Sequence, residues 1–95
     1  MSIDELRSRR SEILSLAAHY GARNVRVFGS IARGEDRADS DVDFLIEVEP
    51  GRSLLDVIGF EQELSQLLGR SVEVLTDGGL SPYLQQQILA EAASL

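Results

Sequence analysis

The sequence contains no cysteine, lysine or tryptophan, and aromatic residues make up only 5% of the chain. Without cysteine, neither a disulfide nor a thiolate metal site can form. No apolar run approaches the roughly 18 residues that a transmembrane helix needs, and residues Met1–Glu5 do not resemble a signal peptide. We therefore expect a cytoplasmic protein that does not bind a membrane.

Positive charge is also scarce. All nine basic residues are arginine, whereas sixteen residues are acidic, which gives a formal net charge of −7. Seven of the acidic residues lie between Glu35 and Glu49. A protein that grips a nucleic-acid backbone has the opposite charge, so stable binding to DNA or RNA is disfavoured. The arginine bias fits either contacts to phosphate groups or codon composition alone.

The length of 95 residues corresponds to a single domain, residues 1–95. Hydrophobic residues form 43% of the chain and charged residues 26%, which is typical of a globular protein and argues against disorder. Because a domain of this size buries only a modest share of its surface, we expect a partner subunit, either a second copy or another protein.

Hydrophobic periodicity divides the chain into alternating helices and strands. Helical spacing marks one helix over about residues 3–20 and another between Ser53 and Gly69. A solvated loop that includes Asp36 is expected at residues 35–40. Strands are predicted at residues 25–28, 42–48 and 70–76, with a short terminal helix after Ser81 and Pro82. This order predicts an α/β (α+β) domain in which a small mixed β-sheet has helices packed on one face and an uncovered opposite face.

Two aspartates begin the second strand. Asp41 and Asp43 are one residue apart, so a strand directs both side chains to the same face. Glu73 alternates with Val72 and Val74 in the third strand and is expected on that face as well. Adjacent carboxylates repel one another unless a cation lies between them. The three carboxylates therefore predict a site for one or two Mg²⁺ ions, because all of the ligands are hard oxygen atoms.

A glycine-serine pair ends the first strand, directly before a predicted helical turn over residues 30–34. Gly29 would let the backbone approach a ligand closely, and Ser30 would offer a hydroxyl and free N–H groups to a phosphate. A metal and a phosphate together indicate a nucleoside triphosphate. Two plainer interpretations stay open: Ser30 as an ordinary helix N-cap, and Arg33 as the salt-bridge partner of Glu35 or Asp39.

The spacing of these residues resembles the signature of a known family. Gly29-Ser30, ten intervening residues and then Asp41-Val42-Asp43 is similar to the motif of the DNA-polymerase-β-like nucleotidyltransferase superfamily. Arg33-Gly34 and Ser40 strengthen the match. Over its whole length the chain resembles the minimal nucleotidyltransferases (MNTs), which implies a palm-like fold.

The resemblance also implies a role for individual residues. It assigns catalysis and metal binding to Asp41, Asp43 and Glu73. The position of Glu73 is more often Asp in the family. The resemblance assigns binding of the nucleotide, with ATP as the substrate, to the turn after the first strand and to one later serine, namely Gly29, Ser30, Arg33 and Ser40.

The acceptor is not evident in the sequence. Larger members of the superfamily carry extra domains that hold the acceptor, and we expect no room for one here. MNTs of this kind resemble the antitoxin half of two-gene modules whose partner is a HEPN-type ribonuclease toxin, which implies transfer of AMP from ATP to a tyrosine of that toxin. Two alternatives stay open: a non-catalytic antitoxin that inhibits the toxin by binding, and a homodimer that transfers a nucleotide to a small molecule.

Overall fold

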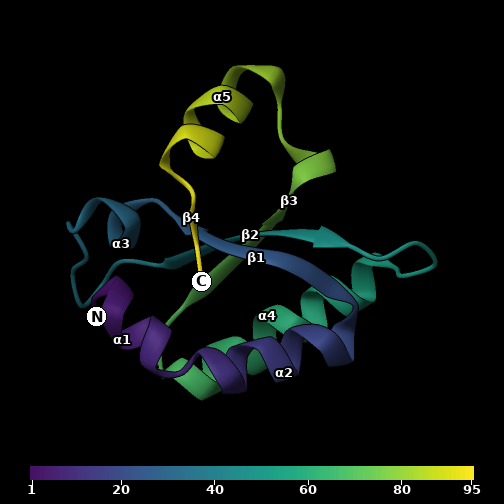
Figure 1. Ribbon diagram of the computed structural model, residues 1–95, viewed down its shortest axis with the longest axis horizontal. Helices are drawn as coiled ribbons and strands as arrows, with labels where there is room; N and C mark the ends of the chain where they lie inside the picture. The colour runs from purple at the N-terminus through teal and green to yellow at the C-terminus, as the bar shows by residue number, and fades with distance from the viewer.

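The structure, a computed structural model, describes residues 1–95 and consists of a sheet with helices on both faces (Figure 1). The helices are α1 (Ile3–Ser8), α2 (Arg10–Tyr20), α3 (Ser30–Arg33), α4 (Leu54–Leu68) and α5 (Pro82–Glu91). The strands are β1 (Ala22–Phe28), β2 (Val42–Val48), β3 (Val72–Thr76) and β4 (Ala93–Ser94), and a 3₁₀ helix over Asp77–Gly79 follows β3. None of the helices has the length and apolar character needed to cross a membrane.

The four strands form one mixed sheet in the order β3-β2-β1-β4. Strand β1 runs antiparallel to both β2 and β4, whereas β2 and β3 are parallel. Parallel neighbours require a crossover connection, and α4 provides it between the end of β2 and the start of β3. The predicted small mixed sheet is therefore confirmed, and its register brings Glu73 opposite Asp43.

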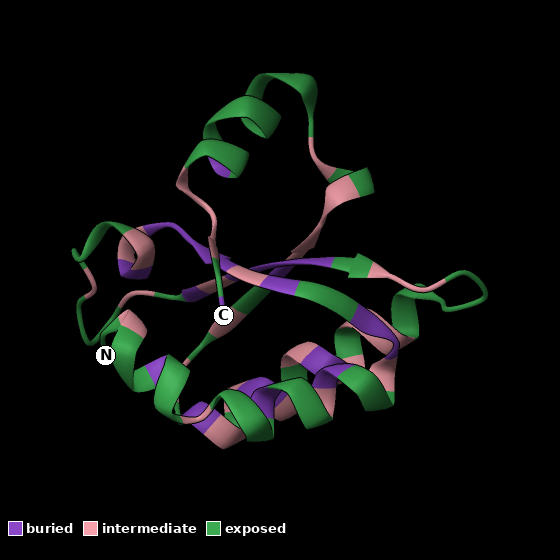
Figure 2. Ribbon diagram, in the orientation of Figure 1, coloured by how far each residue is buried: buried purple, intermediate pink, exposed green.

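Helices α1, α2 and α4 cover one face of the sheet, as predicted (Figure 1). The two-residue period of β2 explains this layer, because Val42, Phe44 and Ile46 point towards these helices and are at most 1% exposed. They belong to the same buried core as Ile13 of α2 and Phe60 of α4. Figure 2 shows the buried segments on the sides of α2 and α4 that meet the sheet.

The opposite face of the sheet is partly covered, so the expectation of a bare face is wrong. Helix α5 lies on that side of the sheet (Figure 1), and its buried residue Ile88 packs with Phe28 of β1 and Leu45 of β2. Leu45 is 0% exposed although it alternates with the residues that face the other helices. An apolar side chain on this face must be shielded from water, and α5 provides the shield.

Two further elements differ from the prediction. The helix expected over residues 3–20 is divided at Arg9, whose backbone angles (φ −106°, ψ 18°) are not helical. The Arg9 guanidinium donates a hydrogen bond to the carbonyl oxygen of Leu67 at the end of α4, at 2.7 Å. Strand β4 was not predicted. It pairs only Ala93 and Ser94 with β1 and is too short to leave a periodic pattern in the sequence.

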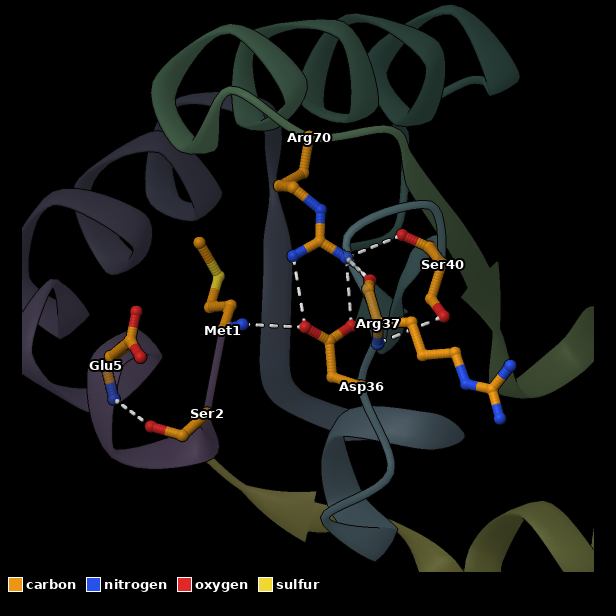
Figure 3. A network of polar contacts seen from close by, with 7 residues as sticks. All are labelled: Met1, Ser2, Glu5, Asp36, Arg37, Ser40 and Arg70. Atoms are coloured by element: carbon orange, nitrogen blue, oxygen red, sulfur yellow. Dashed lines mark hydrogen bonds and ion pairs between the residues drawn. The ribbon is translucent and has the colours of Figure 1, made fainter.

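Asp36, in the loop between α3 and β2, is half-buried, and its side chain is paired rather than solvated as expected. Its side chain is 4% exposed, and its carboxylate accepts hydrogen bonds from the Arg70 guanidinium at 2.9 and 3.1 Å and from the Met1 ammonium at 2.7 Å (Figure 3). Arg70 also donates to the carbonyl oxygens of Arg37 and Ser40, both at 2.7 Å. The network fixes the loop that leads into β2. Hydrogen bonding, from Arg70 above all, lowers the pKa of Asp36 to about 2.

The lowered pKa of Asp36 predicts a pH-dependent part of the free energy of unfolding. Because this pKa lies below the unfolded value of 3.8, the stabilisation is complete above the unfolded pKa and is lost as the pH falls towards 2. In urea unfolding between about pH 5 and pH 2, the wild type should lose on the order of 1–2 kcal/mol more than Asp36→Asn. Two curves that stay parallel across this window would contradict the assignment.

Candidate active site

A surface pocket of about 450 Å³ lies between the end of β1, α3, the start of β2 and α5. Six of the seven residues predicted for the site line it, namely Gly29, Ser30, Arg33, Ser40, Asp41 and Asp43; Glu73 is not among the lining residues. Helix α5 contributes Leu84, Gln87, Ile88 and Glu91, which were not predicted. A larger hollow of about 560 Å³ lies between α2 and α4, away from these residues.

Three carboxylates gather where β2 meets the pocket. Asp41 directly precedes β2 and Asp43 lies within it. Asp43 pairs with Glu73 in the parallel register of β2 and β3, which puts the two side chains next to each other on one face of the sheet. This confirms the expected position of Glu73, whereas its role stays a prediction. Asp43 is half-buried, and Asp41 and Glu73 are exposed.

The acidity of Asp43 is strongly perturbed. Burial raises its pKa most, followed by the charge of Glu73, hydrogen bonding with Glu73 and the charge of Asp41. The positive charge of Arg33 acts in the opposite direction, but the pKa of Asp43 is still raised to about 6. The site therefore holds more negative charge than its own arginine neutralises.

The donor set fits a divalent metal ion. All three side chains offer hard oxygen atoms, which Mg²⁺ prefers. A cation between them would offset both the burial of the Asp43 charge and its repulsion by Glu73 and Asp41, which together raise the pKa of Asp43. No three acidic or histidine side chains of the chain are already in a metal-coordinating arrangement. The assignment of Mg²⁺ to Asp41, Asp43 and Glu73 therefore stays a prediction.

Gly29 is needed at the end of β1 for a reason that differs from the expected approach of a ligand. Its backbone angles (φ 72°, ψ −148°) lie in a region that is essentially restricted to glycine. A Cβ atom at this position would also overlap the Oδ2 atom of Asp43. Because Gly29 has no side chain, the Asp43 carboxylate can occupy this space.

The two serines of the pocket differ in their surroundings. Ser30 is the first residue of α3, and Gly29 occupies the N-cap position without a side-chain capping bond, so the interpretation of Ser30 as the N-cap is wrong. The hydroxyl of Ser40 accepts a hydrogen bond from the N–H of Arg37 at 3.3 Å (Figure 3). Ser40 therefore stabilises the loop before Asp41 and also lines the pocket.

Arg33 forms two ion pairs at the mouth of the pocket. Its Nε donates to Glu35 at 3.2 Å, which confirms one of the two expected partners, and its Nη1 donates to Glu91 of α5 at 2.7 Å. Hydrogen bonding to Glu91, more than to Glu35, raises the pKa of Arg33. The sequence carried a signal for Glu91, because it follows Leu84 and Ile88 at helical spacing on the face of α5 that meets the pocket.

Sequence comparison relates the whole chain to enzymes that transfer nucleotides. The family model described as a nucleotidyltransferase domain matches residues 4–95. A Methanocaldococcus jannaschii protein, named as a candidate protein adenylyltransferase, is 37% identical over 95 residues, which cover 100% of this chain and 99% of that protein. Protein adenylyltransferase MntA of Thermococcus cleftensis is 40% identical over 76 residues, covering 80% of this chain and 77% of MntA.

Solved structures agree with the sequence comparison. A protein described as a candidate minimal nucleotidyltransferase superposes with a TM-score of 0.88 and is 49% identical, over 100% of this chain and 97% of that one. Two complexes share only the fold. They are a toxin-antitoxin with AMP-PNP (TM-score 0.76, 20% identity, 88% of this chain and 69% of that chain) and a tri-AMPylated Shewanella oneidensis HEPN toxin with an MNT antitoxin (TM-score 0.70, 17% identity, 93% and 69%).

The match over residues 4–95, the full-length relatives and the shared fold lead to one conclusion: the chain belongs to the nucleotidyltransferase domain family.

Proposed function

We propose that the chain is a Mg²⁺-dependent protein adenylyltransferase that moves AMP from ATP to a tyrosine hydroxyl of a HEPN-type toxin and so acts as its antitoxin. The observation that carries the proposal is the half-buried Asp43, which pairs with Glu73 in the sheet and lines, with Asp41, a pocket that Gly29, Ser30 and Arg33 also line. Hard anionic oxygen atoms that suit a metal ion therefore lie close to groups that suit phosphate oxygens.

The reaction balances as a displacement at phosphorus. The phenolic oxygen of the acceptor tyrosine forms a bond to the α-phosphorus of ATP, the bond from that phosphorus to the β-phosphate bridging oxygen breaks, and pyrophosphate leaves. The phenolic proton passes to water or to a carboxylate of the site. Bound Mg²⁺ would offset negative charge on the triphosphate and on the attacking oxygen.

One set of residues would bind the metal ions, and another would bind the phosphates. Asp41, Asp43 and Glu73 would hold the ions. The N–H of Gly29, the hydroxyl of Ser30 and the guanidinium of Arg33 would bind the phosphate oxygens, with charge-assisted hydrogen bonds from Arg33 as the strongest of these contacts.

The choice of acceptor is supported by the relatives. One relative, at 37% identity, is named as a candidate protein adenylyltransferase, and another, at 40% identity, is named as a protein adenylyltransferase. Two structures with the same fold are toxin-antitoxin complexes, and in one of them the HEPN toxin carries AMP groups. A HEPN-type toxin encoded beside this chain is therefore the acceptor to test first.

The first test is the intact mass of that toxin after co-expression with the chain. We expect the mass to increase by one or more AMP groups with the wild type and to stay unchanged with Asp43→Asn, because metal binding is lost. Asp39→Asn is the matched control, since Asp39 is an exposed acidic residue of the loop before β2 that does not line the pocket. An unmodified toxin that the wild type and Asp43→Asn neutralise equally would instead support inhibition by binding.

A second prediction concerns the glycine that makes room for Asp43. Gly29→Ala should abolish AMP transfer and destabilise the fold by about 1–3 kcal/mol, because Ala is strained at this backbone conformation and its Cβ overlaps the Asp43 carboxylate.

Gly34→Ala provides the control for backbone strain alone. Gly34 also has a positive φ of 73°, but a Cβ there meets no atom within 4 Å. This variant should lose roughly 1–2 kcal/mol in urea unfolding and keep its AMP transfer. Wild-type activity in Gly29→Ala would show that Asp43 does not need the space that Gly29 leaves.

A further inference from the structure

The carboxylate of Glu91, the last residue of α5, accepts hydrogen bonds from two groups to which the proposed function assigns phosphate binding. One oxygen, Oε1, accepts a hydrogen bond from Arg33 Nη1 at 2.7 Å, and the other, Oε2, accepts one from the backbone N–H of Gly29 at 3.4 Å. The side chain is 21% exposed and lines the pocket together with Asp41 and Asp43. A single carboxylate thus bridges a backbone donor and a guanidinium.

This arrangement is an anion-binding site that already holds an anion. A guanidinium and a backbone N–H are common donors to both carboxylate and phosphate oxygens. Glu91 therefore occupies Gly29 and Arg33 in the way that a phosphate would occupy them. A triphosphate and the Glu91 carboxylate cannot use the same two donors at once, and their negative charges repel each other.

We propose that Glu91 is an internal competitor of the nucleotide, a carboxylate that ATP must displace from Gly29 and Arg33 before its phosphates bind. The inference rests on the proposed function, since it takes these two residues as the phosphate-binding groups. It makes Glu91 a determinant of nucleotide affinity that lies outside the carboxylate cluster of β2 and β3.

The contacts of Glu91 are of a kind that a ligand can replace. The bond to the Gly29 N–H is long at 3.4 Å, and the Arg33 side chain is 44% exposed, so this is a modest surface ion pair. Glu91 is the last helical residue, and Ala92 after it already has extended backbone angles. A rotation of the side chain can therefore free the donors while Ile88 stays in its apolar cluster.

A second role for Glu91 would have the opposite consequence. If its carboxylate served to hold Arg33 in a productive position, removing its charge would weaken nucleotide binding. Glu35 offers a matched comparison, because its side chain also pairs with Arg33, at 3.2 Å, but makes no hydrogen bond to Gly29 and does not line the pocket. Two observations separate the two roles: whether removing the charge of Glu91 strengthens or weakens nucleotide binding, and whether this change is larger than the change at Glu35.

The experiment is isothermal titration calorimetry of the full chain with a non-hydrolysable ATP analogue and Mg²⁺, for the wild type, Glu91→Gln and Glu35→Gln. Glutamine keeps the size of the side chain and removes its charge. We expect Glu91→Gln to lower the Kd by roughly three- to tenfold, the equivalent of one modest ion pair, and Glu35→Gln to change it by less than about twofold. In AMP transfer, Glu91→Gln should lower the KM for ATP without lowering kcat.

Thermal unfolding without nucleotide will check that each variant folds, and Glu91→Ala is the second variant should Glu91→Gln not fold. An unchanged or raised Kd in a folded Glu91 variant would overturn the competitor role while the proposed function stands. If the wild type and the variants all failed to bind the ATP analogue, the proposed function and this inference would fall together.

Discussion

The site depends on one constraint, the parallel register that sets Asp43 of β2 directly beside Glu73 of β3. Burial makes Asp43 costly to charge, and repulsion by the neighbouring carboxylates adds to this cost, so the pKa of Asp43 rises to about 6. The backbone accommodates this carboxylate through Gly29, whose missing side chain leaves the space for Asp43 Oδ2. A cation bound between these carboxylates would lower the electrostatic free energy of the cluster. This connects the local geometry to the nucleotidyl transfer of the family.

The rest of the fold stabilises the two sides of the pocket. On one side, Arg70 binds the Asp36 carboxylate and the carbonyl oxygens of Arg37 and Ser40, and so fixes the loop that enters β2 just before Asp41. On the other side, Ile88 packs on Phe28 and Leu45 and holds α5 over the sheet. This contact brings Glu91 to the donors of Gly29 and Arg33. The apolar cluster of Ile88, Phe28 and Leu45 therefore positions the wall of the pocket that α5 provides.

Much of this arrangement could be predicted from local patterns. The alternation through Val42, Phe44 and Ile46 identified β2 and its buried face, and alternation in β3 put Glu73 on the face of Asp43. The position of α5 depends on contacts between residues far apart in the chain, such as Ile88 with Leu45, which periodicity does not contain. Leu45 was the available signal, since an apolar residue among Asp41, Asp43 and Glu47 needs a cover. Asp36 was misjudged because its partner, Arg70, lies 34 residues away.

Binding of Mn²⁺ in place of Mg²⁺ tests the carboxylate cluster most directly, because it requires no acceptor protein. Electron paramagnetic resonance can follow a titration of Mn²⁺ into the chain with a bound non-hydrolysable ATP analogue. We expect tight binding in the wild type, weaker binding in Asp43→Asn and in Glu73→Gln, and wild-type binding in Asp39→Asn. Wild-type Mn²⁺ affinity in both Asp43→Asn and Glu73→Gln would contradict a metal site built on the register of β2 and β3.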